Sequence, residues 1–255
     1  MLRLPLCCVW VVWGLLLQIS IFIWASTALR QRIIAAWSRG LLGLLGVKVQ
    51  FKSTANFIST ENTAPLVVAN HISWLDIFVL LSHVPVVLVA KKELRAWPVL
   101  GWLIALSGTQ FIDRSRRSSL KQVNAALTQR LQGGIAVAVF PEGTTSAGTH
   151  ILPLHAGVLQ AAMDAKVPIQ PFVLQYTPAH AAEYIGDTTF WQSLCRIMGQ
   201  GRIVATGQQL QVLRFLGRGV GADVGSVSGS GYSDEDTRHT VAARLHSIMS
   251  STLNV

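Results

Sequence analysis

Residues 65–81 read PLVVANHISWLDIFVLL, and this stretch indicates how the rest of the chain folds. Its first five residues form a short apolar run with two valines, which is typical of a buried strand. Asn70, His71 and Ser73 interrupt the run, and a second apolar run follows at residues 77–81. We therefore predict a strand, a turn and a helix, with His71 at the end of the strand.

The same alternation continues along the chain. Short apolar runs predict strands near residues 47–51, 65–70, 84–90, 109–112, 135–140 and 168–176. Residues 115–134 carry leucine and valine at helical spacing and end in two glycines, as a helix should. Strands that alternate with helices predict an α/β domain, with a mixed, largely parallel sheet flanked by helices.

Composition limits the class of protein. The chain has 255 residues, enough for one α/β domain, and 51% of them are hydrophobic while 13% are charged. The chain is too apolar for an ordinary soluble enzyme, and its apolar segments are too interrupted for a polytopic transporter. The net charge of +9 suits nucleic acid, anionic lipid or an acidic carrier protein. The chain lacks the basic and aromatic tract of a single-strand nucleic-acid groove, so the membrane is the favoured partner and nucleic acid is not.

Three cysteines limit the covalent and metal chemistry. Cys7 and Cys8 are adjacent in an apolar segment, and Cys195 is remote in sequence. This set predicts neither a disulfide framework nor a cysteine pair for a metal. We expect no metal site, and the set is compatible with a reducing, cytoplasmic surrounding.

An uncharged segment opens the chain. The 26 residues between Arg3 and Arg30 exceed the ~20 needed to cross a bilayer as a helix. A secretory signal is the alternative, but the run is longer than a usual signal core. Basic residues gather after the segment, at Arg30, Arg32 and Arg39, which places the main domain in the cytoplasm, on the inner membrane if the source is bacterial.

A second helix is expected just after this segment. Trp37, Leu41, Leu44 and Leu45 would lie on one apolar side, so the helix would lie on the membrane and complete a two-helix motif. Whether the N-terminus crosses the bilayer or lies in one leaflet stays open. We predict four regions: a membrane-associating segment at 1–46, an α/β domain at 47–216, a Gly- and Ser-rich loop at 217–234, and a C-terminal helix at 235–255 with Ser233 as its cap.

His71 and Asp76 are the candidate catalytic pair. If Ser73 caps the helix, Asp76 falls at its third position and faces back toward His71. Asp76 would then orient the imidazole while His71 removes a proton from a hydroxyl group. The alternative is a helix cap beside a histidine that is merely hydrogen-bonded at a strand end.

Residues 140–146, FPEGTTS, also follow a predicted strand. Gly143 lets the backbone approach a ligand, and Thr144 and Thr145 offer donors to an anionic group. Glu142 is suited either to bind an acceptor substrate or to brace the turn. The alternative is a turn with solvated hydroxyl groups.

Basic residues supply a third candidate group. Arg114 follows the predicted strand at 109–112, and its guanidinium is suited to holding a phosphate. Lys91 and Lys92 follow the strand at 84–90 and each adds a point charge. A solvated surface position is the alternative for these charges.

Together these residues resemble the glycerolipid acyltransferase family, whose best-known members are the 1-acylglycerol-3-phosphate (lysophosphatidic acid) acyltransferases. His71 and Asp76 match its NHxxxxD signature, residues 111–114 its second block, and residues 140–146 its FPEGT block. A proline-flanked strand at 167–171 matches the last block, and the resemblance runs from about residue 66 to 176.

The resemblance implies direct acyl transfer without an acyl-enzyme, a metal or a cofactor. His71, oriented by Asp76, would deprotonate a lysolipid hydroxyl that attacks the thioester of acyl carrier protein or coenzyme A. The expected product is phosphatidic acid, in phospholipid biosynthesis. A non-catalytic lipid-binding membrane protein and a thioesterase or lipid hydrolase are the alternatives.

One residue departs from the pattern. Many family members that act on lysophosphatidic acid carry arginine directly after EGT, where this chain has Thr145. That arginine is thought to help bind the acceptor phosphate. The departure makes another lysolipid, such as lyso-ornithine lipid, an alternative acceptor, unless Arg114 and Lys91 or Lys92 compensate.

Overall fold

A seven-stranded mixed sheet forms the centre of the computed structural model, which describes residues 3–22, 24–52, 64–96, 100–112, 117–216 and 231–253. The strand order is β1-β7-β6-β2-β5-β3-β4. β6 and β7 pair antiparallel, and the other neighbours pair parallel. This arrangement confirms the predicted α/β class. The strands are β1 (Val47–Lys52), β2 (Leu66–Ala69), β3 (Val87–Lys91), β4 (Gln110–Ile112), β5 (Val137–Val139), β6 (Ile169–Thr177) and β7 (Ile203–Gln209).

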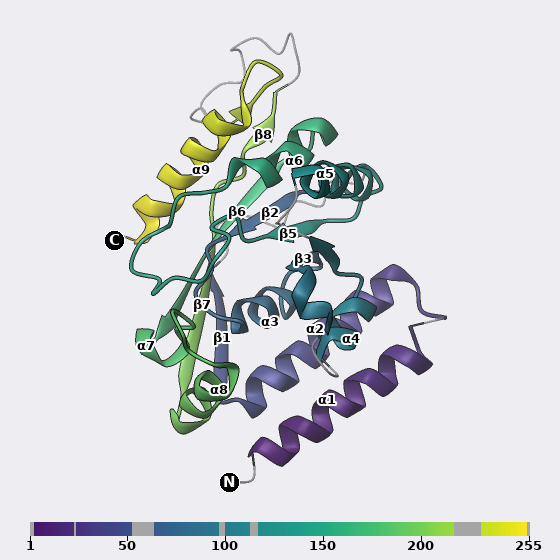
Figure 1. Cartoon of the computed structure of the whole chain (residues 1–255), viewed down its shortest axis with the longest axis vertical. Helices are drawn as coiled ribbons and strands as arrows, with labels where there is room; N and C mark the ends of the chain where they lie inside the picture. Colours follow the sequence, from purple (N-terminus) through teal and green to yellow (C-terminus); the bar gives the residue numbers. More distant parts are fainter. Residues whose placement is uncertain are drawn as a thin grey trace.

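Helices cover both faces of the sheet (Figure 1). Along β2, Val67 and Ala69 join one core cluster with residues of α2, α3 and α8. Leu66 and Val68 join the other cluster with residues of α5, α6 and α9. β2 is therefore buried on both sides, which explains its continuous apolar sequence. The helices are α1 (Arg3–Ser20), α2 (Thr27–Leu44), α3 (Leu75–Leu81), α4 (Leu100–Leu106), α5 (Arg117–Gln132), α6 (Gln160–Ala165), α7 (Ala179–Ala182), α8 (Phe190–Gly199) and α9 (Arg238–Leu253), with short 3-10 turns η1 (Lys92–Ala96) and η2 (Ala156–Leu159).

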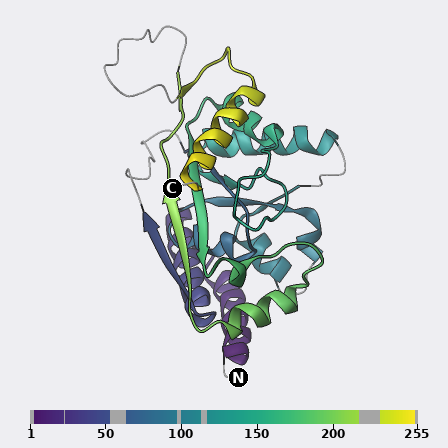
Figure 2. The same cartoon turned by 90° about the vertical axis from the view of Figure 1, so that its left-hand side faces the viewer.

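Two strand features were not predicted from the sequence. β7 alternates buried and half-buried residues and lies between β6 and the edge strand β1 (Figure 2). A small parallel pair, β8 (Arg214–Phe215) and β9 (Gly231–Tyr232), flanks the 217–230 part of the predicted loop, which lies outside the described residues. Tyr232 is buried, and its hydroxyl donates to the carbonyls of Ala162, at 3.1 Å, and Val167.

The C-terminal helix begins later than the sequence predicts. α9 starts at Arg238, five residues after Ser233. Ser233 instead opens a turn, in which its N–H donates to Asp236 at 2.9 Å and its hydroxyl accepts from the N–H of Glu235 at 3.3 Å. The hydroxyl of Thr237 accepts from the N–H of Thr240 at 3.3 Å and takes the capping role.

The apolar side of α2 faces protein, and not lipid as the sequence predicted. Trp37 and Leu41 are 7% and 5% exposed, and Leu45, just after the helix, is 1% exposed. They pack in the same core cluster as β2 and α3. Leu44 is half-buried against that cluster. An apolar helix side has the same sequence pattern whether it packs on protein or on lipid, so periodicity alone did not distinguish the two.

α1 and α2 are held together by two reciprocal hydrogen bonds. The indole N–H of Trp10 donates to the carbonyl of Trp37 at 3.1 Å, and that of Trp37 donates to the carbonyl of Trp10 at 3.0 Å. Each tryptophan ring packs against a glycine of the other helix, where a larger residue would collide with it. A Cβ at Gly14 would lie 2.4 Å from the Trp37 ring, and one at Gly40 would lie 2.1 Å from the Trp10 ring.

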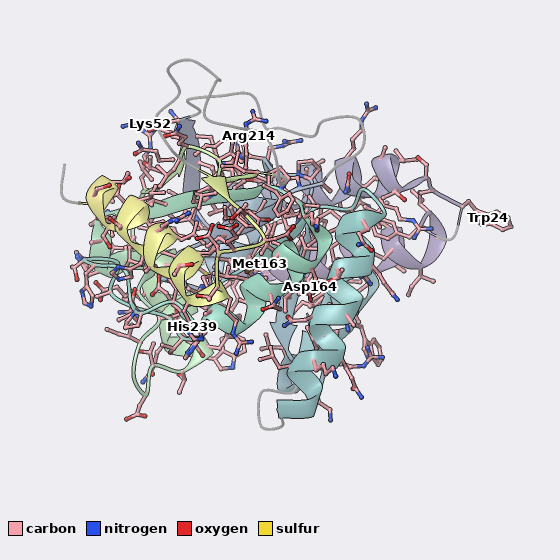
Figure 3. All side chains as sticks on the ribbon, turned by 90° about the horizontal axis from the view of Figure 1, so that it is seen from above. Trp24, Lys52, Met163, Asp164, Arg214 and His239 are labelled. Atoms are coloured by element: carbon pink, nitrogen blue, oxygen red, sulfur yellow. The ribbon has the colours of Figure 1, made fainter. Side chains whose placement is uncertain are left out.

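The outer side of α1 stays exposed. Among the described residues, α1 is the one helix long and apolar enough to cross a membrane. Trp24, just after it, is 87% exposed and reaches outward from the edge of the molecule (Figure 3). Large apolar side chains of α1 that are exposed are Leu4, Leu6, Val9, Val12, Trp13, Leu16 and Ile19.

The glycine contacts generate a matched test of this helix pair. Gly40→Ala forces the Trp10 ring to move, and we expect it to lower the free energy of unfolding by about 1–3 kcal/mol. Gly43→Ala, on the same helix with nothing within 4 Å of its added Cβ, should raise it by up to about 1 kcal/mol through helix propensity. Urea unfolding of both variants in mild detergent measures the difference. Equal stability of the two variants would contradict the packing described here.

Candidate active site

His71 and Asp76 meet across the turn between β2 and α3. Nδ1 of His71 lies 2.8 Å from Oδ2 of Asp76. The side chain of Asp76 is fully buried, and that of His71 is 20% exposed. A carboxylate only accepts hydrogen bonds, so Nδ1 carries the hydrogen, and in the neutral form of the imidazole Nε2 then has the lone pair. The pair thus has the geometry of a base and the group that orients it.

Asp76 also shapes the turn itself. Its Oδ2 accepts from the backbone N–H groups of Ile72 and Ser73, at 2.7 and 2.8 Å. α3 begins at Leu75 with Trp74 as its cap residue, so Asp76 is the second helical residue and not the third, as the sequence predicted. The hydroxyl of Ser73 accepts from the N–H of Leu75 at 3.3 Å, which closes the turn. The capping and orienting roles of Asp76 therefore coexist.

Asn70 fixes the point at which the chain leaves the sheet. Its side-chain oxygen accepts from the N–H of Leu174 at 2.7 Å, and its side-chain nitrogen donates to the carbonyl of Leu174 at 3.0 Å. A buried side chain thus replaces the next backbone pair between β2 and β6. His71 is placed one residue beyond this anchor.

The FPEGTTS segment surrounds His71. The ring of Phe140 stacks on the imidazole with centroids 4.3 Å apart. Oε1 of Glu142 accepts from the N–H of His71 at 3.2 Å, and the N–H of Ser146 donates to the carbonyl of His71 at 2.8 Å. β5 lies beside β2, so the two motifs that follow these strands meet at one edge of the sheet.

Glu142 is a buried acid beside the pair. It is 3% exposed, and its Oε2 makes no well-formed hydrogen bond to the described residues. Burial raises the pKa of Glu142 from 4.5 to about 7, while the N–H groups of His71 and Leu152 oppose the rise. The nearby charge of Asp76 adds to it.

The residues after Glu142 have different surroundings. Gly143 takes a φ of +75°, in the region that favours glycine. Thr144 is exposed. Thr145 donates through its hydroxyl to the carbonyl of Tyr184, whose N–H donates to the carbonyl of Ile72 at 3.0 Å. The hydroxyl of Thr145 therefore fastens the segment before α8 to the FPEGTTS segment.

Two of the three predicted basic residues, Lys91 and Lys92, lie in the described part of the chain. Lys91 ends β3, beside β5, so its backbone lies at the same edge of the sheet as His71. Lys92 is exposed in η1. Arg114 lies outside the described residues.

Tyr176 is a residue of this site that sequence reasoning missed. Its hydroxyl donates to Oδ1 of Asp76 at 2.6 Å, and the side chain is buried. Burial and the neighbouring Asp76 charge raise the pKa of Tyr176 well above its ordinary value, so it stays a neutral donor. The available signal was a tyrosine in a strand that is mostly buried, where its hydroxyl needs a partner.

A cavity of about 410 Å³ lies elsewhere, between α6, β8 and the start of α9. Met163, Asp164 and His239 are among the residues that line it, and Figure 3 labels them. Neither His71 nor Asp76 lines it. The cavity is therefore separate from the candidate catalytic pair.

Known proteins resemble this chain in sequence and in fold. The 1-acyl-sn-glycerol-3-phosphate acyltransferase of Neisseria gonorrhoeae is 37% identical over 147 residues, 58% of this chain and 56% of the relative, so the match spans little more than half of that protein. The lyso-ornithine lipid O-acyltransferase of Pseudomonas aeruginosa is 35% identical over 176 residues, 68% of this chain and 66% of the relative.

A solved structure has a similar fold. The crystal structure of the 1-acyl-sn-glycerophosphate (LPA) acyltransferase, PlsC, from Thermotoga maritima superposes with a TM-score of 0.59 and 20% identity, covering 88% of this chain and 78% of that one. The family model described as Acyltransferase matches residues 48–175, from β1 into β6, and so includes both motifs. This chain belongs to the acyltransferase family.

Proposed function

We propose that the protein is a membrane-bound O-acyltransferase that transfers a fatty acyl group from a thioester to the free hydroxyl of a lysolipid. The observation that best supports this proposal is the 2.8 Å contact between Nδ1 of His71 and Oδ2 of the buried Asp76. This contact leaves Nε2 as the proton acceptor, on a side chain that is partly open to solvent.

His71 and Asp76 are sufficient for the proton transfers of the proposed acyl transfer. Nε2 of His71 takes the proton of the acceptor hydroxyl, and the oxygen attacks the carbonyl carbon of the thioester. The tetrahedral intermediate collapses, the carbon–sulfur bond breaks, and the leaving thiolate takes the proton from the imidazolium. Asp76 stabilises the imidazolium formed in between. The donor is a thioester of acyl carrier protein or coenzyme A, and the proposed step uses no further cofactor or metal.

The proposed location is a membrane. The exposed apolar side of α1 would enter lipid, and the net charge of +9 suits an anionic surface and an acidic carrier. Arg30 and Arg32, which follow α1, favour a catalytic domain that faces the cytoplasm, on the inner membrane if the source is bacterial.

We propose 1-acylglycerol-3-phosphate as the first acceptor, which would give phosphatidic acid in phospholipid biosynthesis. Lys91, Lys92 and Arg114 are the residues proposed to hold its phosphate. Lyso-ornithine lipid is a second candidate, because the Thr145 hydroxyl is bonded to the carbonyl of Tyr184. Thr145 therefore offers no free donor in place of the arginine that many relatives carry.

His71→Ala should lower acyl transfer by at least 100-fold because it removes the base. Transfer is measured as labelled acyl lipid formed from acyl carrier protein and coenzyme A thioesters. His239→Ala removes an exposed histidine of α9 and is the matched control, with activity unchanged.

Both variants should fold and bind vesicles like the natural protein. Retained turnover in His71→Ala contradicts the assigned base. Lipid binding without thioester consumption by the natural protein indicates a non-catalytic binding protein, and release of free fatty acid indicates a hydrolase.

A competition assay tests the acceptor. With equal amounts of 1-acylglycerol-3-phosphate and lyso-ornithine lipid, we expect phosphatidic acid as the main product if the basic residues hold the phosphate. Lys92→Ala should then raise the KM for the phosphate acceptor alone. Ornithine lipid as the main product excludes the first candidate and supports the second.

We propose that Glu142 braces the site and does not contact the acceptor. Its Oε1 is occupied by the N–H of His71, and the side chain is 3% exposed. A carboxyl with a pKa raised to about 7 stabilises the fold below pH 4.5, and this contribution is lost as pH rises through 7. Glu142→Gln keeps the Oε1 acceptor and removes the ionisation.

Unfolding free energies across pH test this role. The natural protein should lose on the order of 3 kcal/mol from this residue between pH 4.5 and 7, and Glu142→Gln should lack that loss. Glu235→Gln, at an exposed carboxylate, is the control. Identical slopes in the natural protein and Glu142→Gln would count against a buried, proton-binding Glu142.

A further inference from the structure

Asp76 depends on four donors. Oδ2 accepts from Nδ1 of His71 and from the backbone of Ile72 and Ser73. Among the described residues, the hydroxyl of Tyr176 is the one donor to Oδ1, at 2.6 Å. No lysine or arginine in the described part of the chain forms an ion pair with Asp76. A buried carboxylate without a fixed cation must have its oxygens hydrogen-bonded.

Tyr176 reaches the pair from the central sheet. It lies in β6, which pairs with β2 on one side and with β7 on the other. Two residues earlier on β6, Leu174 holds both polar atoms of Asn70. One strand thus fixes the start of the His71 turn through its backbone and the orienting carboxylate through a side chain 100 residues away in sequence.

We propose that Tyr176 is a positioning residue, which fixes the rotamer of Asp76 and sets how strongly its carboxylate draws a proton onto His71. The proposal rests on the proposed function of the His71–Asp76 pair. A hydrogen bond from the phenol disperses the charge on Asp76 and weakens its attraction for the imidazolium. Within the described part of the chain, Tyr176 and Glu142 are the titratable groups with recorded interactions with this pair.

Tyr176→Phe removes the hydroxyl and leaves the ring. We expect kcat to fall about 10- to 100-fold, with little change in KM, because Asp76 loses the bond that fixes its rotamer beside His71. The acid limb of the pH profile should move to higher pH, since the carboxylate then holds the imidazole proton more strongly. Fluorotyrosine at position 176 keeps the hydroxyl and makes it a stronger donor, so the limb should move to lower pH.

Tyr232→Phe is the matched control. Tyr232 is also buried in the sheet region, but its hydroxyl donates to the carbonyls of Ala162 and Val167, in the other core cluster. Its loss should lower stability and leave the pH profile unchanged. A purely structural Tyr176 predicts the same result for Tyr176→Phe, and that result overturns the proposal.

A titration without substrate separates this proposal from the proposed function. Protein labelled with ¹⁵N-histidine in detergent micelles is titrated by NMR, and His71→Ala identifies the His71 signal. The midpoint should move to higher pH in Tyr176→Phe and to lower pH with fluorotyrosine, even if no acceptor is acylated. Unmoved midpoints in both proteins refute the role of Tyr176, whatever the activity assay gives.

Discussion

The buried carboxylate of Asp76 is the constraint on which the site depends. Water does not reach it, so every compensating hydrogen bond comes from the protein. Those bonds link the turn after β2, the start of α3 and the tautomer of His71 to β6. The catalytic geometry and the local turn therefore share the same contacts at Asp76.

The FPEGTTS segment adds a second layer to this arrangement. Phe140 covers one face of the imidazole, and Glu142 and Ser146 hold the backbone of His71 on both sides. Thr145 then ties this segment to Tyr184. Thr145, which replaces the arginine of many relatives, thus has a structural partner of its own. Its identity bears on which acceptor binds and not on the proton transfer at His71.

Much of this arrangement was predictable from the sequence, and there are physical reasons why the other parts were not. The strand, turn and helix at residues 65–81 follow from local apolar patterns, and parallel strands bring the two motifs to one edge. The contact of Tyr176 with Asp76 was not predictable, because no local pattern links residues that far apart. β7 was missed because Gly207 and Gln209 occupy buried positions at which an alternating strand usually has large apolar residues. The apolar side of α2 has the same periodicity in protein and in lipid, so only the fold identified what covers it.

The paired tryptophans of α1 and α2 have a consequence for how a substrate meets the site. α2 is packed into the domain, and the two indole bonds hold α1 at a fixed place beside it. If α1 enters lipid as proposed, the height of His71 above the bilayer is set by helix packing and not by a flexible tether. A lysolipid would then meet His71 at a distance from its leaflet that the packing of α1 and α2 sets.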